Sequence, residues 1–86
     1  MLNFEFDPAK DAANIAKHGV SLSLADAFEF HAVVKDERGD YGEDRFNAFG
    51  VIDAVTYCMT FTLRGKSVRV ISLRRARAKE YSRYVE

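Results

Sequence analysis

The last sixteen residues of the chain, ISLRRARAKEYSRYVE, concentrate positive charge directly after an apolar run. Within six positions they carry Arg74, Arg75, Arg77 and Lys79. A guanidinium group binds two phosphate oxygens at once through its planar fork, so this cluster suits a phosphate-bearing ligand. An ordinary solvated helix face, balanced by acidic residues elsewhere in the fold, is the alternative interpretation.

The formal net charge of zero conceals a strong asymmetry along the chain. Residues 1–59 carry five Lys and Arg against eleven Asp and Glu, whereas residues 60–86 carry eight against two. A basic segment of this kind is the electrostatic footprint expected for a nucleic-acid partner.

Cleavage of RNA is one reaction that these residue types could perform without a cofactor. A base removes the proton of the ribose 2′-hydroxyl, cations stabilise the charge that develops on the phosphate, and an acid protonates the leaving oxygen. The arginines available for the phosphate are Arg64, Arg69, Arg74, Arg75, Arg77 and Arg83. The candidates for proton transfer are His18, Glu80, Tyr81 and Tyr84.

Each candidate also has a structural interpretation. Arg69 alternates with Val68 and Val70, so in a regular strand it shares a face with Ile71 and Leu73 and could simply lie along the sheet. Glu80 can form an ordinary helical ion pair with Arg77 or Arg83. Tyr81 and Tyr84 are also explained as packing residues of an amphipathic helix, and His18 as a favourable charge at a helix C-terminus.

Metal and cofactor chemistry are not expected. The histidines, His18 and His31, are thirteen residues apart without a ligand at a familiar spacing, and the chain has no glycine-rich phosphate loop. Cys58, the only cysteine, lies in an apolar run, which indicates a buried and unreactive thiol in a reducing compartment. No signal peptide and no apolar run of about 20 residues is present, so we expect a soluble cytoplasmic protein without a membrane partner.

The elements that must position these residues form a single α+β domain over residues 1–86. The segment LNFEF (residues 2–6) alternates apolar and polar side chains and suits a short strand or an extended entry. Asp7 followed by Pro8 begins a first helix, which Gly19 ends, and a second helix begins at Ser21 or Ser23 and buries Leu24, Ala25 and Phe28. Alternating apolar residues then predict an antiparallel sheet of about four strands, and a C-terminal helix follows. The predicted strands are residues 30–37, 46–51, 55–63 and 67–73, and the last helix covers residues 76–85.

Three segments closely resemble the signature motifs of the BrnT toxin family. They are FDPAKDAANIAKHGVS (residues 6–21), GEDRF (42–46) and RGKSVRVISLRRARAKE (64–80), and together they span nearly the whole chain. The resemblance implies a RelE/ParE-like fold and the ribonuclease half of a bacterial type II toxin–antitoxin pair, which arrests translation and growth. It also implies a BrnA-like ribbon-helix-helix antitoxin, a heterotetramer that represses its own operon, and contact with operator DNA only through the antitoxin.

Combined with the residue chemistry above, the resemblance leads to a hypothesis about roles. Arg64, Arg69 and Arg74 or Arg75 would hold the scissile phosphate, and His18, Glu80 or Tyr81 would move protons, without a metal ion. The positions that would follow the RNA backbone are Lys10, Lys17, Arg45 and Arg77, although Lys10 and Lys17 are equally explained as a solvated helix face. The chain departs from the family pattern at Phe6, where relatives often have tryptophan, and at Leu63, where they often have an acidic residue. The second departure weakens any scheme that needs a carboxylate beside Arg64.

Two other functions remain compatible with the same fold. The chain could poison a target other than RNA, as ParE-type toxins do with DNA gyrase, or it could be a non-catalytic module that only binds an antitoxin. Fold by itself does not distinguish these functions from RNA cleavage.

Overall fold

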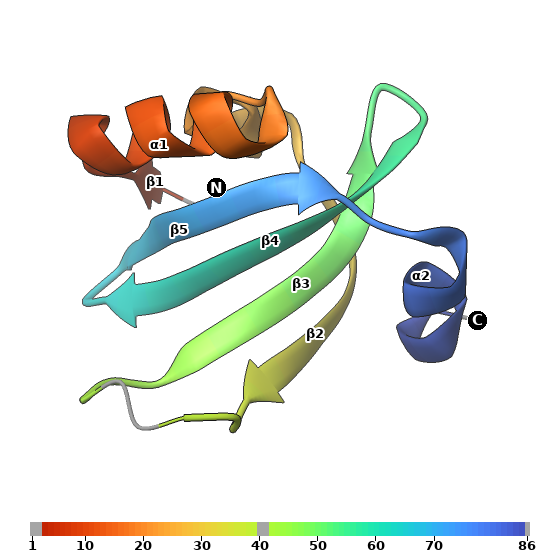
Figure 1. The fold of residues 1–86 in the computed structure, drawn as a ribbon. Coiled ribbons are helices and arrows are strands. Elements are labelled where there is room, and N and C mark those ends of the chain that lie inside the picture. The colour runs from red at the N-terminus through yellow and green to blue at the C-terminus, as the bar shows by residue number, and fades with distance from the viewer. Residues whose placement is uncertain (1–2, 40–41, 86) are drawn as a thin grey trace.

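The computed structural model describes residues 3–39 and 42–85, which form one mixed five-stranded sheet with three short helices (Figure 1). The strand order is β1-β5-β4-β3-β2, with β1 parallel to β5 and the other pairs antiparallel. The strands are β1 (Asn3–Glu5), β2 (Glu29–Asp36), β3 (Arg45–Ile52), β4 (Val55–Arg64) and β5 (Ser67–Arg75). The helices are α1 (Pro8–His18), the 3₁₀ helix η1 (Leu22–Ala27) and α2 (Ala78–Tyr84).

The α+β class is therefore confirmed, but the number and direction of the strands differ from the prediction. The extended N-terminal segment is a fifth strand, β1, and its parallel pairing with β5 makes the sheet mixed. The alternation in this segment allows a short strand, but no local pattern indicates its partner, which lies more than sixty residues away. The C-terminal helix is also shorter than predicted, covering Ala78–Tyr84.

The second predicted helix is a 3₁₀ helix, so the α-helical prediction for this segment is wrong. Its buried residues, Leu22, Ala25 and Phe28, recur every third position, which is the period of a 3₁₀ helix, whereas Leu24 is exposed. Ser21, rather than Ser23, is the N-cap. The backbone N–H of Leu22 donates to Oδ1 of Asp11 in α1 at 2.7 Å. A contact with another helix therefore stabilises the first turn of η1.

The limits of α1 are those that the sequence predicts. Oδ1 of Asp7 accepts a hydrogen bond from the N–H of Ala9 at 2.8 Å, and Pro8 occupies the first turn. Gly19 takes the left-handed conformation, with φ of 71°, and its N–H donates to the carbonyl oxygen of Ile15. The side chain of Ile15 is exposed, and the buried residue of α1 is polar.

That buried residue, Asn14, attaches α1 to the edge of β5. Strand β1 pairs with only the first residues of β5, so the backbone of Leu73 has no strand partner on that side. The side-chain amide of Asn14 takes the place of a strand: it donates to the carbonyl oxygen of Leu73 at 2.8 Å and accepts from its N–H at 3.1 Å. A further bond to the carbonyl oxygen of Val20 fixes the chain where it leaves the helix. Asn14 thus determines where α1 lies relative to the sheet.

A bulge at Ile71 decides which residues of β5 face the core. Thr60 of β4 is opposite Ser72, but the next residue of β4, Phe61, is opposite Val70, so Ile71 is an extra residue. Consequently Leu73 lies on the buried face, and the prediction that Arg69 shares its face is wrong. Arg69, Ser72 and Arg74 share the other face.

The two faces of the sheet have different surroundings. The core face carries the residues predicted for the buried side of β4, Tyr57, Met59 and Phe61, which pack with η1. The opposite face, called here the open face, is flanked by α1 along β5 and by α2 beyond the end of β5 (Figure 1). None of the helices in the described residues has the length and apolar composition needed to cross a membrane.

Candidate active site

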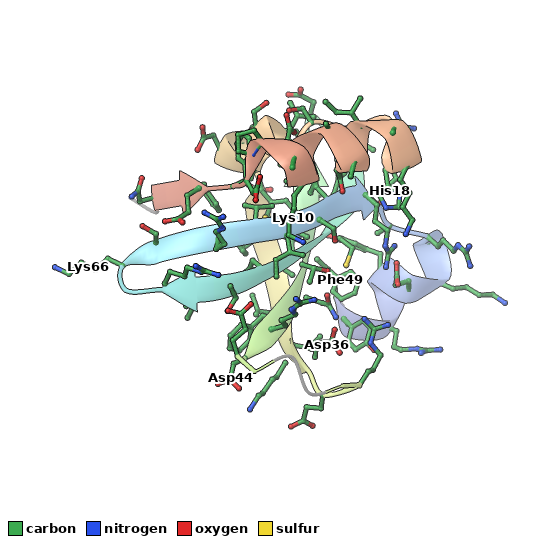
Figure 2. The ribbon with its side chains drawn as sticks, turned by 60° about the vertical axis from the view of Figure 1, so that its left-hand side comes forward. Lys10, His18, Asp36, Asp44, Phe49 and Lys66 are labelled. Atoms are coloured by element: carbon green, nitrogen blue, oxygen red, sulfur yellow. The ribbon has the colours of Figure 1, made fainter. Side chains whose placement is uncertain are left out.

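The open face forms the floor of a concavity of about 570 Å³. Side chains from three strands form this floor, α1 contributes one wall, and α2 together with the end of β2 closes the others. Figure 2 shows Lys10 and His18 extending from α1 over the face on which Phe49 and Asp36 lie. The lining residues used below are Lys10, Lys17, His18, Asp36, Arg38, Asn47, Phe49, Cys58, Thr60, Ser72, Arg74, Glu80 and Tyr84.

A second concavity continues the first along the end of the sheet. Its volume is about 590 Å³, and it shares Lys17, His18, Arg74 and Glu80 with the first while adding Arg75 and Arg77. Together the two are lined by seven Lys and Arg side chains and only three carboxylates. A surface of this charge, hollowed along its length, suits a polyanion.

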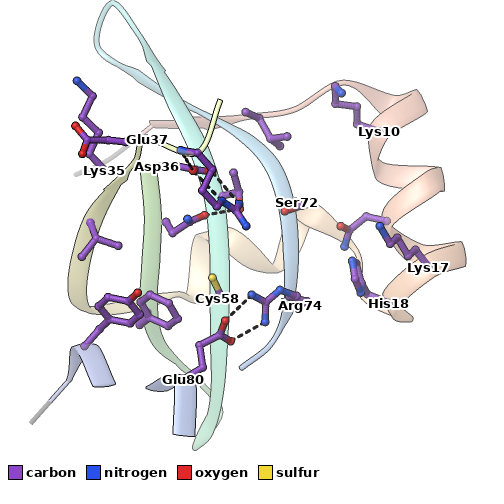
Figure 3. A pocket seen from close by; sticks show the side chains of 18 of the residues that line it. Lys10, Lys17, His18, Lys35, Asp36, Glu37, Cys58, Ser72, Arg74 and Glu80 are labelled. Carbon is purple, nitrogen blue, oxygen red and sulfur yellow. Dashed lines mark hydrogen bonds and ion pairs between the residues drawn. The ribbon is translucent and has the colours of Figure 1, made fainter. Parts of the chain in front are cut away.

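Arg74 is held at the junction of the two concavities by Glu80. Its guanidinium donates two hydrogen bonds to the carboxylate, at 2.8 and 2.9 Å, as Figure 3 shows. This hydrogen-bonded contact lowers the pKa of Glu80 and raises that of Arg74, so both groups are charged at neutral pH. The predicted helical pairing of Glu80 with Arg77 or Arg83 is replaced by this longer-range pair between α2 and β5. Glu80 orients the arginine. Nη1 also donates to the carbonyl oxygen of Arg75 at 3.4 Å, whereas the Nε–H and the second N–H of Nη2 have no acceptor among the described residues.

His18 lies beside Arg74 at the C-terminus of α1 (Figure 3). Burial and the positive charges of Lys17 and Arg74 lower the pKa of His18 below its ordinary value of 6.5. The imidazole is therefore mainly neutral at neutral pH, and a neutral imidazole can accept a proton.

Cys58 lies in the floor of the concavity, next to the Arg74–Glu80 pair (Figure 3). Burial raises the pKa of its thiol to about 11, and the opposing effect of Arg74 is smaller. The thiol is thus protonated at neutral pH, which agrees with the predicted unreactive cysteine.

The four arginines nominated for the phosphate are not brought together. Among the described residues that line the first concavity, Arg74 is the only one of the four, and Arg75 lines the second. Arg69 lies on the open face but is opposite Thr62, four residues along β4 from Cys58, or roughly 13 Å away. It forms an ion pair with Glu5 at 2.8 Å.

Two other nominated residues lie away from the concavity. Arg64 ends β4 at the hairpin and is 3.7 Å from Glu43. Tyr81 projects from α2 toward β2, where its hydroxyl forms a hydrogen bond with Nδ1 of His31. Tyr84, one turn after Glu80, lies in the concavity instead and stacks on Phe49.

The residues nominated for the RNA backbone are divided in the same way. Lys10 and Lys17 lie with Asn14 on the side of α1 that faces the first concavity, and Arg77 lines the second. Neither lysine has an ion-pair partner among the described residues. Arg45 begins β3 opposite Asp36, two residues before Asn47 and so on the same open face, but it is not among the lining residues.

A polar row across the floor was not singled out from the sequence. Asn47, Thr60 and Ser72 are aligned on three neighbouring strands, and all three line the concavity. The signal was present, because Asn47 interrupts an otherwise apolar strand and Thr60 belongs to the polar side of β4. Strand register decides that these three residues lie side by side, and the sequence does not reveal the register. Within the described residues, no group of three or more His, Cys, Asp or Glu side chains is placed to hold a metal ion.

Comparison with known proteins gives a consistent result. Residues 6–80 match the sequence model of a family described as the ribonuclease toxin, BrnT, of type II toxin–antitoxin systems. The fold is similar to the crystal structure of the Brucella abortus ribonuclease toxin, BrnT, with a TM-score of 0.68 and 25% sequence identity. That alignment covers 90% of this chain and 99% of the other. Curated protein sequences give no significant match.

Proposed function

Because this chain belongs to the BrnT family of ribonuclease toxins, we propose that it cleaves RNA by attack of a ribose 2′-hydroxyl on the adjacent phosphate, at the junction of the two concavities. The products of this reaction are a cyclic phosphate and a free 5′-hydroxyl. The family match covers residues 6–80, which include α1 and the Arg74–Glu80 pair.

Arg74 is the group that we assign to the scissile phosphate. Its guanidinium is oriented by two hydrogen bonds to Glu80, so the donors aimed at the phosphate are fixed before the substrate arrives. Donors fixed in this way stabilise the charge that develops in the transition state without reorganising. Glu80 is therefore a positioning residue in this scheme rather than the general base.

His18 is the group that we assign to removal of the 2′-hydroxyl proton. It is mainly neutral at neutral pH because burial, Lys17 and Arg74 oppose its protonation. Lys10, Lys17, Arg75 and Arg77 would bind the phosphates on either side of the cleaved one, since they lie along the two connected concavities. Catalytic roles for Arg64, Arg69 and Tyr81, and RNA contact by Arg45, stay predictions from the sequence.

The family also implies an antitoxin partner. We expect it to resemble BrnA, a ribbon-helix-helix protein that neutralises the toxin in a heterotetramer and represses the operon. The formation of this complex is measurable by mass photometry after co-expression, with the heterotetramer as the expected species.

The observation that carries the proposal is the pre-oriented Arg74 in a cation-lined concavity beside a neutral histidine. The test is cleavage of a purified, unstructured RNA by antitoxin-free protein in the presence of a chelator, which the proposal expects to proceed. Arg74→Ala should lower the rate about 10²–10³-fold, as loss of a transition-state donor does. Lys66→Ala, which removes a cation from the distant hairpin, should have no effect (Figure 2).

Other outcomes would support the competing functions. Intact RNA together with DNA damage in cells would favour a target other than RNA. Intact RNA without any growth defect would favour a module that only binds an antitoxin. Arg64→Ala and Arg69→Ala test the assignment made from sequence: a loss as large as that of Arg74→Ala would place the phosphate elsewhere.

A further inference from the structure

We propose that the first concavity, between α1 and the open face, contains a nucleobase subsite, in which the base beside the cleaved phosphate stacks on Tyr84 and is hydrogen-bonded by Asn47. This inference rests on the proposed function and adds to it the group that gives the enzyme its base preference. The ligand class is a single-stranded nucleotide with its base turned into the concavity.

Asn47 is placed to bind the edge of a base. Its side chain lies in the polar row of the floor, and Oγ1 of Thr60 donates to its Oδ1 at 2.8 Å. This bond fixes the orientation of the amide, and Nδ2 has no hydrogen-bond partner in the part of the chain that the structure describes. The amide therefore presents two donors, and the second lone pair of Oδ1, to whatever occupies the concavity. Adjacent donors and acceptors are what the edge of a nucleobase requires.

Tyr84 provides a face on which a base can stack. Its ring is stacked on Phe49 with centroids 4.8 Å apart and an interplanar angle of 14°. Phe49 is buried and supports the tyrosine from below, whereas Tyr84 is 42% exposed in the wall of the concavity. Proteins that bind single-stranded RNA use exposed aromatic rings for stacking, because every base has such a face.

The spacing between these groups and Arg74 fits one nucleotide. Asn47 is two strands and two residues away from Arg74 in the sheet, which gives a Cα separation of roughly 12 Å. Both side chains extend into the concavity, so a base on Asn47 and its phosphate on Arg74 fit between them. Glu80 and Tyr84 are one turn apart on α2, so the same helix face orients the phosphate-binding arginine and supplies the stacking ring.

The test measures base preference separately from rate. Purified wild-type protein and variants are incubated with single-stranded RNA that is randomised in sequence, and the cleaved ends are sequenced. Asn47→Asp replaces two donors by an acceptor, so the preference at one position beside the cut should change at least fivefold, whatever happens to the total rate. Thr60→Val, which leaves Asn47 in place without its fixing bond, should weaken the same preference.

The stacking half of the proposal has its own variants. Tyr84→Ala should lower kcat/KM about tenfold for all bases, and Tyr84→Phe should restore it, since the phenyl ring still stacks. Leu24→Ala, an exposed residue of η1 on the other side of the molecule, is the control that should match the wild type. Circular dichroism of each variant verifies folding. A cleavage profile for Asn47→Asp identical to the wild type, or an unchanged kcat/KM for Tyr84→Ala, would overturn the subsite.

A second measurement separates this inference from the proposed function. Binding of fluorescein-labelled 2′-O-methyl RNA hexamers, which lack the attacking hydroxyl, needs the subsite but no catalysis. If the wild type does not cleave RNA, the proposed function fails. The subsite is then supported by hexamer binding that weakens about tenfold in Tyr84→Ala but not in Leu24→Ala, and is overturned by equal binding.

Discussion

The two faces of the sheet are made from alternate residues of the same strands, yet they differ in almost every physical property. On β4, Met59 is fully buried in the core, while its neighbour Thr60 lies in the floor of the concavity. The core face is closed by apolar contacts with η1. The open face holds its charges in specific pairs, such as Arg74 with Glu80 and Arg38 with Asp36. We infer that the core face stabilises the fold and that the open face is available for chemistry.

The helices show the same division. The exposed fraction of Leu22 and Ala25 in η1 is 1% or less, whereas α2 has no buried residue. Among the described residues, side-chain contacts with Arg74, His31 and Phe49 join α2 to the sheet. Substitutions on the open face should therefore change activity more than stability, and those on the core face should do the reverse.

The largest effect is expected at His18, on the open side. If His18 removes the 2′-hydroxyl proton, His18→Gln should lower the cleavage rate about 10²–10⁴-fold, with the thermal midpoint nearly unchanged. The rate of the wild type should be constant above pH 6.5 and fall about tenfold per pH unit below the lowered pKa of His18, because only the neutral ring accepts a proton. Initial rates between pH 4.5 and 8 measure this profile. If His18→Gln still shows the fall in rate at low pH, another group is the base.

The next effect is expected in the core. Leu73→Ala should reduce the free energy of unfolding by about 2–5 kcal/mol, because the cavity it leaves cannot be filled by the surrounding sheet. Ser72→Ala, the adjacent residue on the open face, should change it by less than about 0.5 kcal/mol. Urea denaturation of both variants measures the difference. Equal losses would mean that the bulge at Ile71 does not separate the two faces in solution.

The smallest effect is expected for the stability contribution of the Arg74–Glu80 pair. Both side chains are about one-third exposed, so Glu80→Gln should cost less than about 1 kcal/mol of unfolding free energy at pH 7. The folded-state pKa of Glu80 lies below its ordinary value of 4.5, so the contribution is present above pH 4.5 and is lost as the pH falls through the lowered pKa. Thermal melts of both proteins between pH 7 and pH 3 should show a difference that shrinks as the pH falls, and a constant difference would exclude the ion pair as its cause.

Several parts of this fold follow from short-range patterns. Asp7, Pro8 and Gly19 limit α1 because capping groups act on backbone atoms only a few residues away. Alternation along β4 separates Met59 from Thr60 without reference to any other strand. The three BrnT-like motifs identify the family because they preserve residue types in order, and the match over residues 6–80 agrees with them.

What the sequence determined by itself was therefore the positions of most elements, the polar side of β4 and the family. Tertiary structure alone decided which arginine enters the concavity, because the bulge at Ile71 and the pairing with β4 set the direction of every later side chain in β5. It also decided that Glu80 orients Arg74 and that Asn14 completes the edge of β5 from fifty-nine residues away. Contacts at such separations depend on strand register and packing, which no local pattern of residues encodes.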